Sequence, residues 1–521
     1  MIQKKWILLF VIAGFSLAIT AQSLEKADKK ELKKATKSLS YEDYLDAFEI
    51  YIELYKKYPN NVDVKFGYAV CKLHQKGKES QALPLLETIS NTKNLENFYY
   101  HIGVAYLWQG QFENAINSFQ TVLTDSKRTI PEVDVLDQLN NSYASIELMQ
   151  AQRNVEIINL GKAINSEYQE SSPVVLPDEK GMFYTSRSPL SNTENTTDHL
   201  NDNFQEVFYA QKKDNKWTNA TNLSAINSPL HDASVSVNTN GSLFLFFKTN
   251  PDKVSGGDIY QANCLESGEM TEIKKLGPNI NTEYIESSAC LTPGDHTMYF
   301  SSNRPGGYGG FDIYKCNKLP NGEWALPINL GPVINSKGNE TAPFVHADGR
   351  TMYFSSNGLY GLGGYDIFET KLSKDNYWKK PINMGYPINT KNHDMYFSIT
   401  ADSRKAYLSS DREGGYGGDD IYEINLLDHE SFKTVVRGNT TDDESGTTIP
   451  TKITLINNIN KNLNGIYRSN PNNGNFIVIV QPLQTYQFII ESPGYETKIL
   501  DFSFEELSDM ANMNVKLAKT K

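Results

Sequence analysis

The spacing of hydrophobic residues changes twice along the chain. From about residue 22 to residue 150, apolar and small residues recur at helical spacing, as in FYYHIGVAYLWQGQFENAINSFQTVL (98–123). From 153 to 427 the pattern consists of short apolar runs separated by Gly, Asn and Asp, which is typical of strands and turns. Further strand patterns, such as NFIVIVQP (475–482), fill a third segment, 432–518. The pattern therefore predicts a multidomain chain with one α-helical domain followed by two all-β domains.

The middle segment is built from a repeat of about 54 residues. One recurring feature is an acidic residue at the start of a strand, with spacings of 52, 54, 54 and 54: Glu206, Asp258, Asp312, Asp366 and Asp420. A second is the asparagine that closes phrases such as LGPNIN, with spacings of 62, 54, 54 and 54: Asn165, Asn227, Asn281, Asn335 and Asn389. The longer first interval contains a polar insertion, 188–202.

Each repeat contains four short strands joined by tight turns, which is the content of one propeller blade. The two recurring features are out of phase, because the chain enters with a lone strand, RNVEIINLG (153–161), and leaves after a third strand, DDIYEINL (419–426). The entering strand would complete the last blade and pair an edge that would otherwise be open. The count predicts a five-bladed β-propeller over 153–427.

The glycine-rich stretch YFSSNRPGGYGGFDIY (299–314) has the composition of a loop that cradles phosphate. Such a loop occurs once and opens a helix, whereas this stretch recurs at 355–368 and 409–422 and is followed by a strand pattern. Tight turns between strands are therefore the favoured interpretation. The aspartate after each glycine run is expected to hold the turn through backbone amides.

The first 21 residues form a separate segment. Lys4 and Lys5 precede an apolar run from Trp6 to Ala18, which is too short for a membrane span and is typical of a secretory signal peptide. We expect cleavage near Ala21 after Sec-type export, and no later stretch is long and apolar enough to cross a bilayer. The mature chain is therefore expected to be exported.

Charge and cysteine usage narrow the function classes. The net charge of -12 argues against a general nucleic-acid-binding role. The four cysteines are too scattered for a disulfide scaffold and lack the paired spacing of a zinc site: Cys71, Cys264, Cys290 and Cys316. Two interpretations stay open, namely buried free thiols or a bridge between Cys264 and Cys290 in an oxidising compartment.

The helical segment resembles tetratricopeptide repeats in the positions of its small residues. Ala47, Ala82 and Ala115 fall at the expected helix crossings, spaced 35 and 33 residues apart. The resemblance covers about three repeats and implies a curved solenoid whose groove binds a peptide or another protein. A spacer or a dimer surface is an equally weighted alternative.

The order of domains resembles that of a group of envelope proteins. The middle repeats resemble the WD-repeat-like PD40 propellers of periplasmic proteins such as TolB. NPNNGNF (470–476) and SPGYET (492–497) resemble the carboxypeptidase-regulatory-like β-sandwich. A tetratricopeptide stack followed by these two domains resembles the peptidoglycan-associated periplasmic subunit of the Bacteroidetes type IX secretion and gliding apparatus.

This resemblance implies a periplasmic, outer-membrane-associated protein. Its partners would be outer-membrane or periplasmic proteins of the secretion apparatus. The family continues into an OmpA-type domain that grips peptidoglycan. Because no such motif follows the sandwich here, any contact with peptidoglycan is expected to be indirect.

Five carboxylates occupy the same place in the five repeats, at the approach to the innermost strand: Glu170, Asp232, Glu286, Glu340 and Asp394. We expect them to surround one mouth of the central channel. There they would either bind a hard cation such as calcium or accept hydrogen bonds from a neighbouring blade's backbone. The structural role is favoured, because function usually breaks repeat symmetry, and the sequence assigns no cofactor and no metal ligand.

A second set of candidates lies on loops at one face of the predicted propeller. The residues expected to project there and to bind a partner are Arg304, Tyr308, Tyr360, Arg412 and Tyr416. Tyrosine and arginine dominate binding hot spots, although packing of the tyrosines between blades is an equal alternative. No catalytic constellation is found. The sequence therefore predicts a non-enzymatic scaffold, with a glycan-binding protein or glycan-active enzyme that uses the same face as the alternative.

Overall fold

The computed structural model describes residues 23–75, 77–89, 95–126, 128–189, 203–250, 256–265, 267–428, 433–481, 484–504 and 510–520. The predicted signal peptide (1–21) lies outside the described residues. The chain divides into two compact units, of which one ends at Leu136 and the other begins at Asp137. Among the described residues, no helix is long and apolar enough to cross a membrane.

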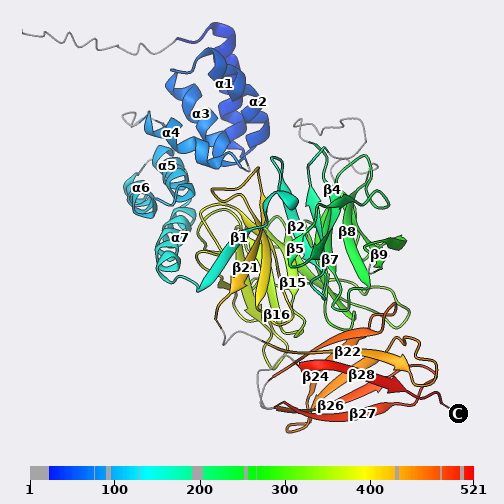
Figure 1. Ribbon diagram of the computed structural model, residues 1–521. Coiled ribbons are helices and arrows are strands. Elements are labelled where there is room, and N and C mark those ends of the chain that lie inside the picture. The colour runs from blue at the N-terminus through cyan, green and yellow to red at the C-terminus, as the bar shows by residue number, and fades with distance from the viewer. Residues whose placement is uncertain are drawn as a thin grey trace, which may run out of the picture. The chain divides into compact units, whose positions relative to one another are not determined.

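The first unit is helical (Figure 1). Its elements are α1(Lys26–Ser40), α2(Tyr44–Lys57), α3(Val62–Leu73), η1(Glu79–Gln81), α4(Ala82–Glu87), α5(Phe98–Trp108) and α6(Phe112–Thr124). Small residues allow close packing of these helices. Ala47, Ala82 and Ala115 are completely buried, and a Cβ at Gly103 would lie 2.7 Å from the ring of Phe119 on α6.

The boundary between the units falls inside α7(Glu132–Gln150), earlier than the expected change near residue 150. The part of α7 from Asp137 onward belongs to the second unit because it makes contacts there. Asn141 and Ser145 both form hydrogen bonds with the backbone of Gly361.

Most of the second unit consists of antiparallel sheets that follow one another along the chain, and five of them lie in the described residues before β22. Sheet I contains β2(Glu170–Val175), β3(Gly181–Ser186), β4(Glu206–Lys213), β5(Lys216–Trp217) and β6(Thr221–Asn222). Sheet II contains β7(Asp232–Val237), β8(Leu243–Thr249), β9(Gly257–Cys264) and β10(Met270–Lys275). Sheet III contains β11(Glu286–Leu291), β12(Thr297–Ser302), β13(Asp312–Asn317) and β14(Ile328–Asn329). Sheet IV contains β15(Glu340–Val345), β16(Thr351–Ser356), β17(Asp366–Lys371) and β18(Ile382–Asn383). Sheet V contains β19(Asp394–Ile399), β20(Lys405–Ser410), β21(Asp420–Leu426) and β1(Val155–Asn159).

The first strands of these sheets form a closed ring. β2 contacts β7, β7 contacts β11, β11 contacts β15, β15 contacts β19, and β19 contacts β2 again. β1 pairs antiparallel with β21, so the strand that enters the ring completes the sheet that leaves it. This pairing was predicted from the phase of the repeats and is confirmed. The closed ring of antiparallel sheets is a β-propeller-type arrangement.

The C-terminal segment forms two further sheets around one core. One has the strand order β25(Asn475–Val480), β22(Thr434–Asp442), β28(Met510–Leu517). The other has the order β24(Leu463–Arg468), β23(Lys452–Asn457), β26(Gln484–Glu491), β27(Lys498–Phe504). Phe476, Phe488 and Tyr486 are among the buried residues of their common core. Val435, Ile477 and Ile479 pack against Ala347 and Ala401 of the ring, which ties this segment to the propeller.

Candidate functional site

The glycine-rich loops are junctions between neighbouring sheets. Each links a second strand to a third strand, and one glycine in it faces the backbone that leads into the next sheet. A Cβ added at Gly309 would lie 2.1 Å from the carbonyl oxygen of Gly338, and one added at Gly363 would lie 2.1 Å from that of Lys391. A Cβ added at Gly417 would lie 1.9 Å from the carbonyl oxygen of Tyr168. Such distances exclude any side chain, so these positions need glycine. The loops are followed by strands β13, β17 and β21, as expected for turns.

The aspartate after each loop holds its backbone, as predicted. Asp312 accepts hydrogen bonds from the N–H groups of Tyr308 at 2.6 Å and Gly309 at 3.1 Å. Asp420 accepts from the N–H of Tyr416 at 2.7 Å, and Asp366 accepts from the N–H of Leu362 at 2.6 Å. The carboxylates therefore fix the shape of the loops.

The closing asparagines have a role that the sequence reasoning missed. The side chain of Asn335 accepts from the N–H of Ile313 at 2.8 Å and donates to its carbonyl at 3.1 Å. The same two bonds join Asn165 to Ile421, Asn227 to Val207 and Asn389 to Ile367. Each amide thus pairs with the third strand as a strand residue would. The fixed spacing between these asparagines and the acidic residues at the start of the third strands could have indicated this pairing.

The five ring carboxylates are buried first residues of first strands. Glu340 accepts hydrogen bonds from the N–H and the hydroxyl of Ser336, at 2.7 and 2.6 Å, and from the hydroxyl of Ser356 at 2.6 Å. These donors come from the turn four residues earlier and from the second strand of the same sheet. The backbone donor to Glu340 lies in the link between sheets III and IV, directly after Asn335. Burial raises the pKa of Glu340, of Glu170 and of Asp232.

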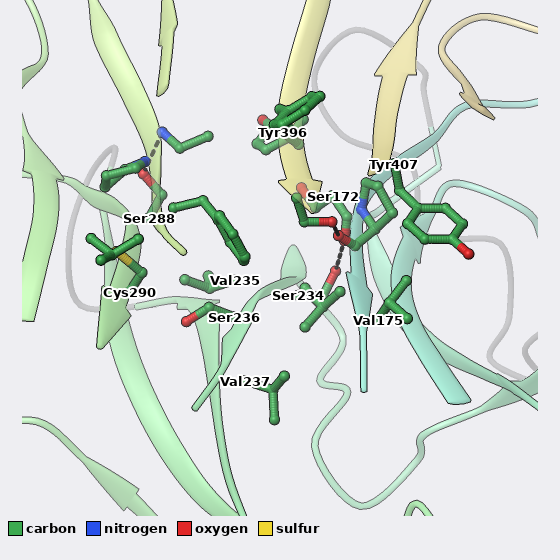
Figure 2. A pocket seen from close by; sticks show the side chains of 18 of the residues that line it. Ser172, Val175, Ser234, Val235, Ser236, Val237, Ser288, Cys290, Tyr396 and Tyr407 are labelled. Carbon is green, nitrogen blue, oxygen red and sulfur yellow. Dashed lines mark hydrogen bonds between the residues drawn. The ribbon is translucent and has the colours of Figure 1, made fainter. Parts of the chain in front are cut away.

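The central cavity is separate from the ring carboxylates, whose expected place at one mouth of the channel stays a prediction. A cavity of about 290 Å³ lies between the first strands, and in the described residues none of the five carboxylates lines it. Figure 2 shows serine, valine and tyrosine side chains along its wall, where the hydroxyl of Ser234 donates to the carbonyl of Ser172 at 2.7 Å. Ile477 of β25 also contributes to the wall. No cluster of three or more His, Cys, Asp or Glu suited to a metal ion is found within the described ranges.

The two candidate arginines do not project from the face, which corrects an expectation. The side chain of Arg304 is 13% exposed and forms an ion pair with Glu286 at 3.2 Å. It also donates to the carbonyl of Ile280 at 2.7 Å. Arg412 pairs with Asp394 at 2.6 Å and donates to the carbonyl of Ile388 at 2.9 Å. Both guanidinium groups therefore stabilise the turns beneath the loops.

The candidate tyrosines are exposed, as expected for a binding surface. Tyr308, Tyr360 and Tyr416 are 52%, 44% and 46% exposed. The backbone N–H groups of Tyr308 and Tyr416 are fixed by Asp312 and Asp420, so these rings extend from rigid loops. The hydroxyl of Tyr360 lies 3.4 Å from Asp137 of α7. Packing between sheets stays an alternative for Tyr416, because Lys162 lies 6.0 Å from the centroid of its ring.

All four cysteines are free and buried, so the open alternative of a bridge between Cys264 and Cys290 is not adopted. Burial raises the pKa of Cys290 to about 12. These thiols therefore have the character of small core residues.

Asp366 is expected to make stability depend on pH. Its Oδ2 accepts from Leu362 and Asn383 at 2.6 and 2.7 Å, while its Oδ1 is buried without a hydrogen-bond partner among the described residues. Burial, with a smaller effect from the charge of Asp394, raises the pKa of Asp366 from 3.8 to about 8. The contribution of this group to stability is therefore complete below about pH 4 and is lost as pH rises toward 8.

The test is Asp366→Asn, which cannot ionise. Its melting temperature at pH 8 should exceed that of the wild type by about 2 °C or more, and the advantage should shrink at pH 5. Asp375→Asn, an exposed control in the turn between β17 and β18, should follow the wild type at both pH values. Equal pH profiles for wild type and Asp366→Asn would show that Asp366 is ionised in the folded state throughout this range.

Comparisons with known proteins assign no family to the chain. No protein-family model matches the chain, and no curated protein matches it. A TolB-like protein from Agrobacterium tumefaciens is 13% identical, with 62% of this chain and 96% of that chain covered, at a TM-score of 0.31. An α-L-arabinofuranosidase from Lactobacillus brevis is 13% identical, with 58% of this chain and 96% of that chain covered, at a TM-score of 0.34. An endo-arabinase from Bacteroides thetaiotaomicron is 12% identical, with 52% of this chain and 96% of that chain covered, at a TM-score of 0.34.

A shared activity does not follow at these identities and TM-scores. The ring of sheets defines the class: the second unit is a β-propeller-type protein with an attached β-sandwich.

Proposed function

We propose that this protein is a non-enzymatic scaffold of the cell envelope, exported to the periplasm and associated with type IX secretion or gliding machinery. Its architecture would be a tetratricopeptide stack, a five-bladed PD40-type propeller and a carboxypeptidase-regulatory-like sandwich. The order of these domains, as it stands in the sequence, supports the assignment to that machinery.

One observation carries the proposal of a binding face on the propeller. Tyr308 and Tyr416 occupy equivalent positions in two repeated loops and are about half exposed, while the charged groups beneath them have partners within the fold. A rigid loop that presents an aromatic ring loses little conformational entropy when it binds. Exposed aromatic side chains on a preformed surface are typical of protein-binding hot spots.

The test is photo-crosslinking in living cells with a photoreactive amino acid in place of Tyr308 or Tyr416. Capture of the same envelope protein from both positions is the expected result. Tyr377 is a matched control, since it is a tyrosine of the same propeller that is 75% exposed in the turn between β17 and β18. A probe at Tyr106 in α5 reports on the helical unit separately.

The opposite outcome is also defined. No protein adduct at Tyr308 or Tyr416, together with saturable binding of envelope glycans by the purified chain, would contradict the scaffold and favour the glycan-binding alternative. Loss of that glycan binding in Tyr308→Ala, with Tyr377→Ala unchanged, would assign it to the same face.

A further inference from the structure

One glycine-rich loop of the propeller already holds a helix. The part of α7 after Asp137 lies against the loop between β16 and β17. The N–H of Gly361 donates to the side chain of Asn141 at 2.7 Å, and the hydroxyl of Ser145 lies 2.6 Å from the carbonyl oxygen of Gly361. Asn141 and Ser145 are four residues apart, so they lie on one face of the helix. Ser145 is completely buried in this contact.

Two other loops present the same carbonyl group in the same setting. Leu362 in this loop corresponds to Tyr308 and Tyr416, because each lies four residues before the anchoring aspartate. All three donate their N–H to that aspartate, at 2.6, 2.6 and 2.7 Å. A planar trans peptide points its carbonyl opposite to its N–H. The carbonyl oxygens of Gly307 and Gly415 therefore point away from the anchor, as that of Gly361 does.

The loops differ in the exposure of the residue four positions before the anchoring aspartate. Leu362 is 1% exposed in the loop whose Gly361 contacts α7, whereas Tyr308 and Tyr416 are 52% and 46% exposed. Within the described residues, no hydrogen bond reaches the carbonyl oxygen of Gly307 or Gly415. These loops thus retain the acceptor that α7 uses, beside an exposed aromatic ring.

We propose that the loops of Tyr308 and Tyr416 receive an α-helix of the partner protein. The helix donates a side-chain hydroxyl or amide to the carbonyl of Gly307 or Gly415 and packs an apolar residue, one turn away, against the tyrosine ring. This inference rests on the proposed function, since it specifies the partner's contact with the same face.

The contact made by Asn141 is not part of the proposed motif. Gly306 and Gly414 have φ of +89°, in the left-handed region, while Tyr360 at the corresponding position does not. The peptide that carries the N–H of Gly307 or Gly415 is therefore turned differently from that of Gly361. The shared element is the carbonyl acceptor alone.

The test uses a synthetic peptide of residues 132–150, held helical by a staple on its solvent-exposed side, as the probe. The full chain carries a photoreactive residue at 308 or at 416. We expect a saturable adduct at both positions, with about fivefold weaker binding for a Ser145→Ala peptide, the effect of one neutral hydrogen bond. A Glu147→Ala peptide, altered at an exposed position of α7, is the matched control and should bind as the parent does.

Two results would overturn the inference: no adduct at saturating peptide, or equal binding by the Ser145→Ala peptide. Mapping which partner residues are crosslinked in cells tests the helix proposal separately from the proposed function. Crosslinks confined to a strand or loop of the partner, or to a second copy of this chain, would reject the helix. Crosslinks spaced three or four residues apart on one partner helix would support it. Absence of any captured partner would reject the proposed function itself.

Discussion

Replacing Gly417 with alanine is expected to destabilise the second unit far more than the same change at the adjacent Gly418. A Cβ added at Gly417 would lie 1.9 Å from the carbonyl oxygen of Tyr168, at the junction where sheet V meets sheet I. That backbone cannot retreat freely, because the N–H of Gly418 donates to the same oxygen at 2.7 Å. Overpacking and the loss of this bond together should cost about 3 kcal/mol.

The neighbouring position provides the control. A Cβ at Gly418 would lie 3.5 Å from the Cβ of Gln169, which is ordinary van der Waals contact. Thermal melts followed by circular dichroism should show a fall of roughly 5 °C for Gly417→Ala and little change for Gly418→Ala. Equal melting temperatures for the two variants would mean that the junction between the last and first sheets can open without cost.

The repeat pattern predicted the closure of the ring, because the number of strands in the first and last repeats shows which strand lacks a partner. The lone entering strand and the missing fourth strand of the last repeat had to pair, and β1 does pair with β21. The turns held by Asp312 and Asp420 were predictable for a similar reason, since a carboxylate close in sequence to a glycine turn can reach its amides. Both features follow from local spacing.

The partners of the arginines could not be predicted, because they depend on where the side chain points. Arg304 and Tyr308 share one loop in the sequence, yet one is nearly buried and the other is half exposed. The guanidinium folds back onto Glu286 and the carbonyl of Ile280, which lie 18 and 24 residues earlier. The contact of α7 with Gly361 escaped prediction for the same reason, as it joins residues 216 and 220 positions apart.

The repeated polar residues are largely occupied in holding the repeats together. Carboxylates, asparagines and arginines that recur in several sheets bind the turns and strands of those sheets. Features that vary between loops are therefore the ones that can carry specificity. The position equivalent to Tyr308 is leucine in the loop that contacts α7 through Gly361 and tyrosine in the two other loops.

Replacing Glu286 with alanine should lower the free energy of unfolding by about 3–5 kcal/mol, because it would leave a nearly buried guanidinium without its charge partner. Glu286 is completely buried and accepts from the N–H and hydroxyl of Thr282, at 2.9 and 2.7 Å, and from Ser302 at 2.9 Å. It also pairs with Arg304. Glu283→Ala, three residues earlier at an exposed position, removes the same type of side chain without these contacts. In denaturant unfolding, the free energies of unfolding of the two variants should differ by nearly all of this loss.

The same pair of variants decides between the structural role and an ion-binding role for the ring carboxylates. If their oxygens serve the turns, a chelator should leave the melting temperature of the wild type unchanged, and added calcium should not rescue Glu286→Ala. A chelator-induced fall in the wild type that is absent in Glu286→Ala would instead assign this carboxylate to a cation. Equal stability of Glu286→Ala and Glu283→Ala would reject both roles, since the ion pair and the hydrogen bonds to Thr282 and Ser302 would then contribute nothing.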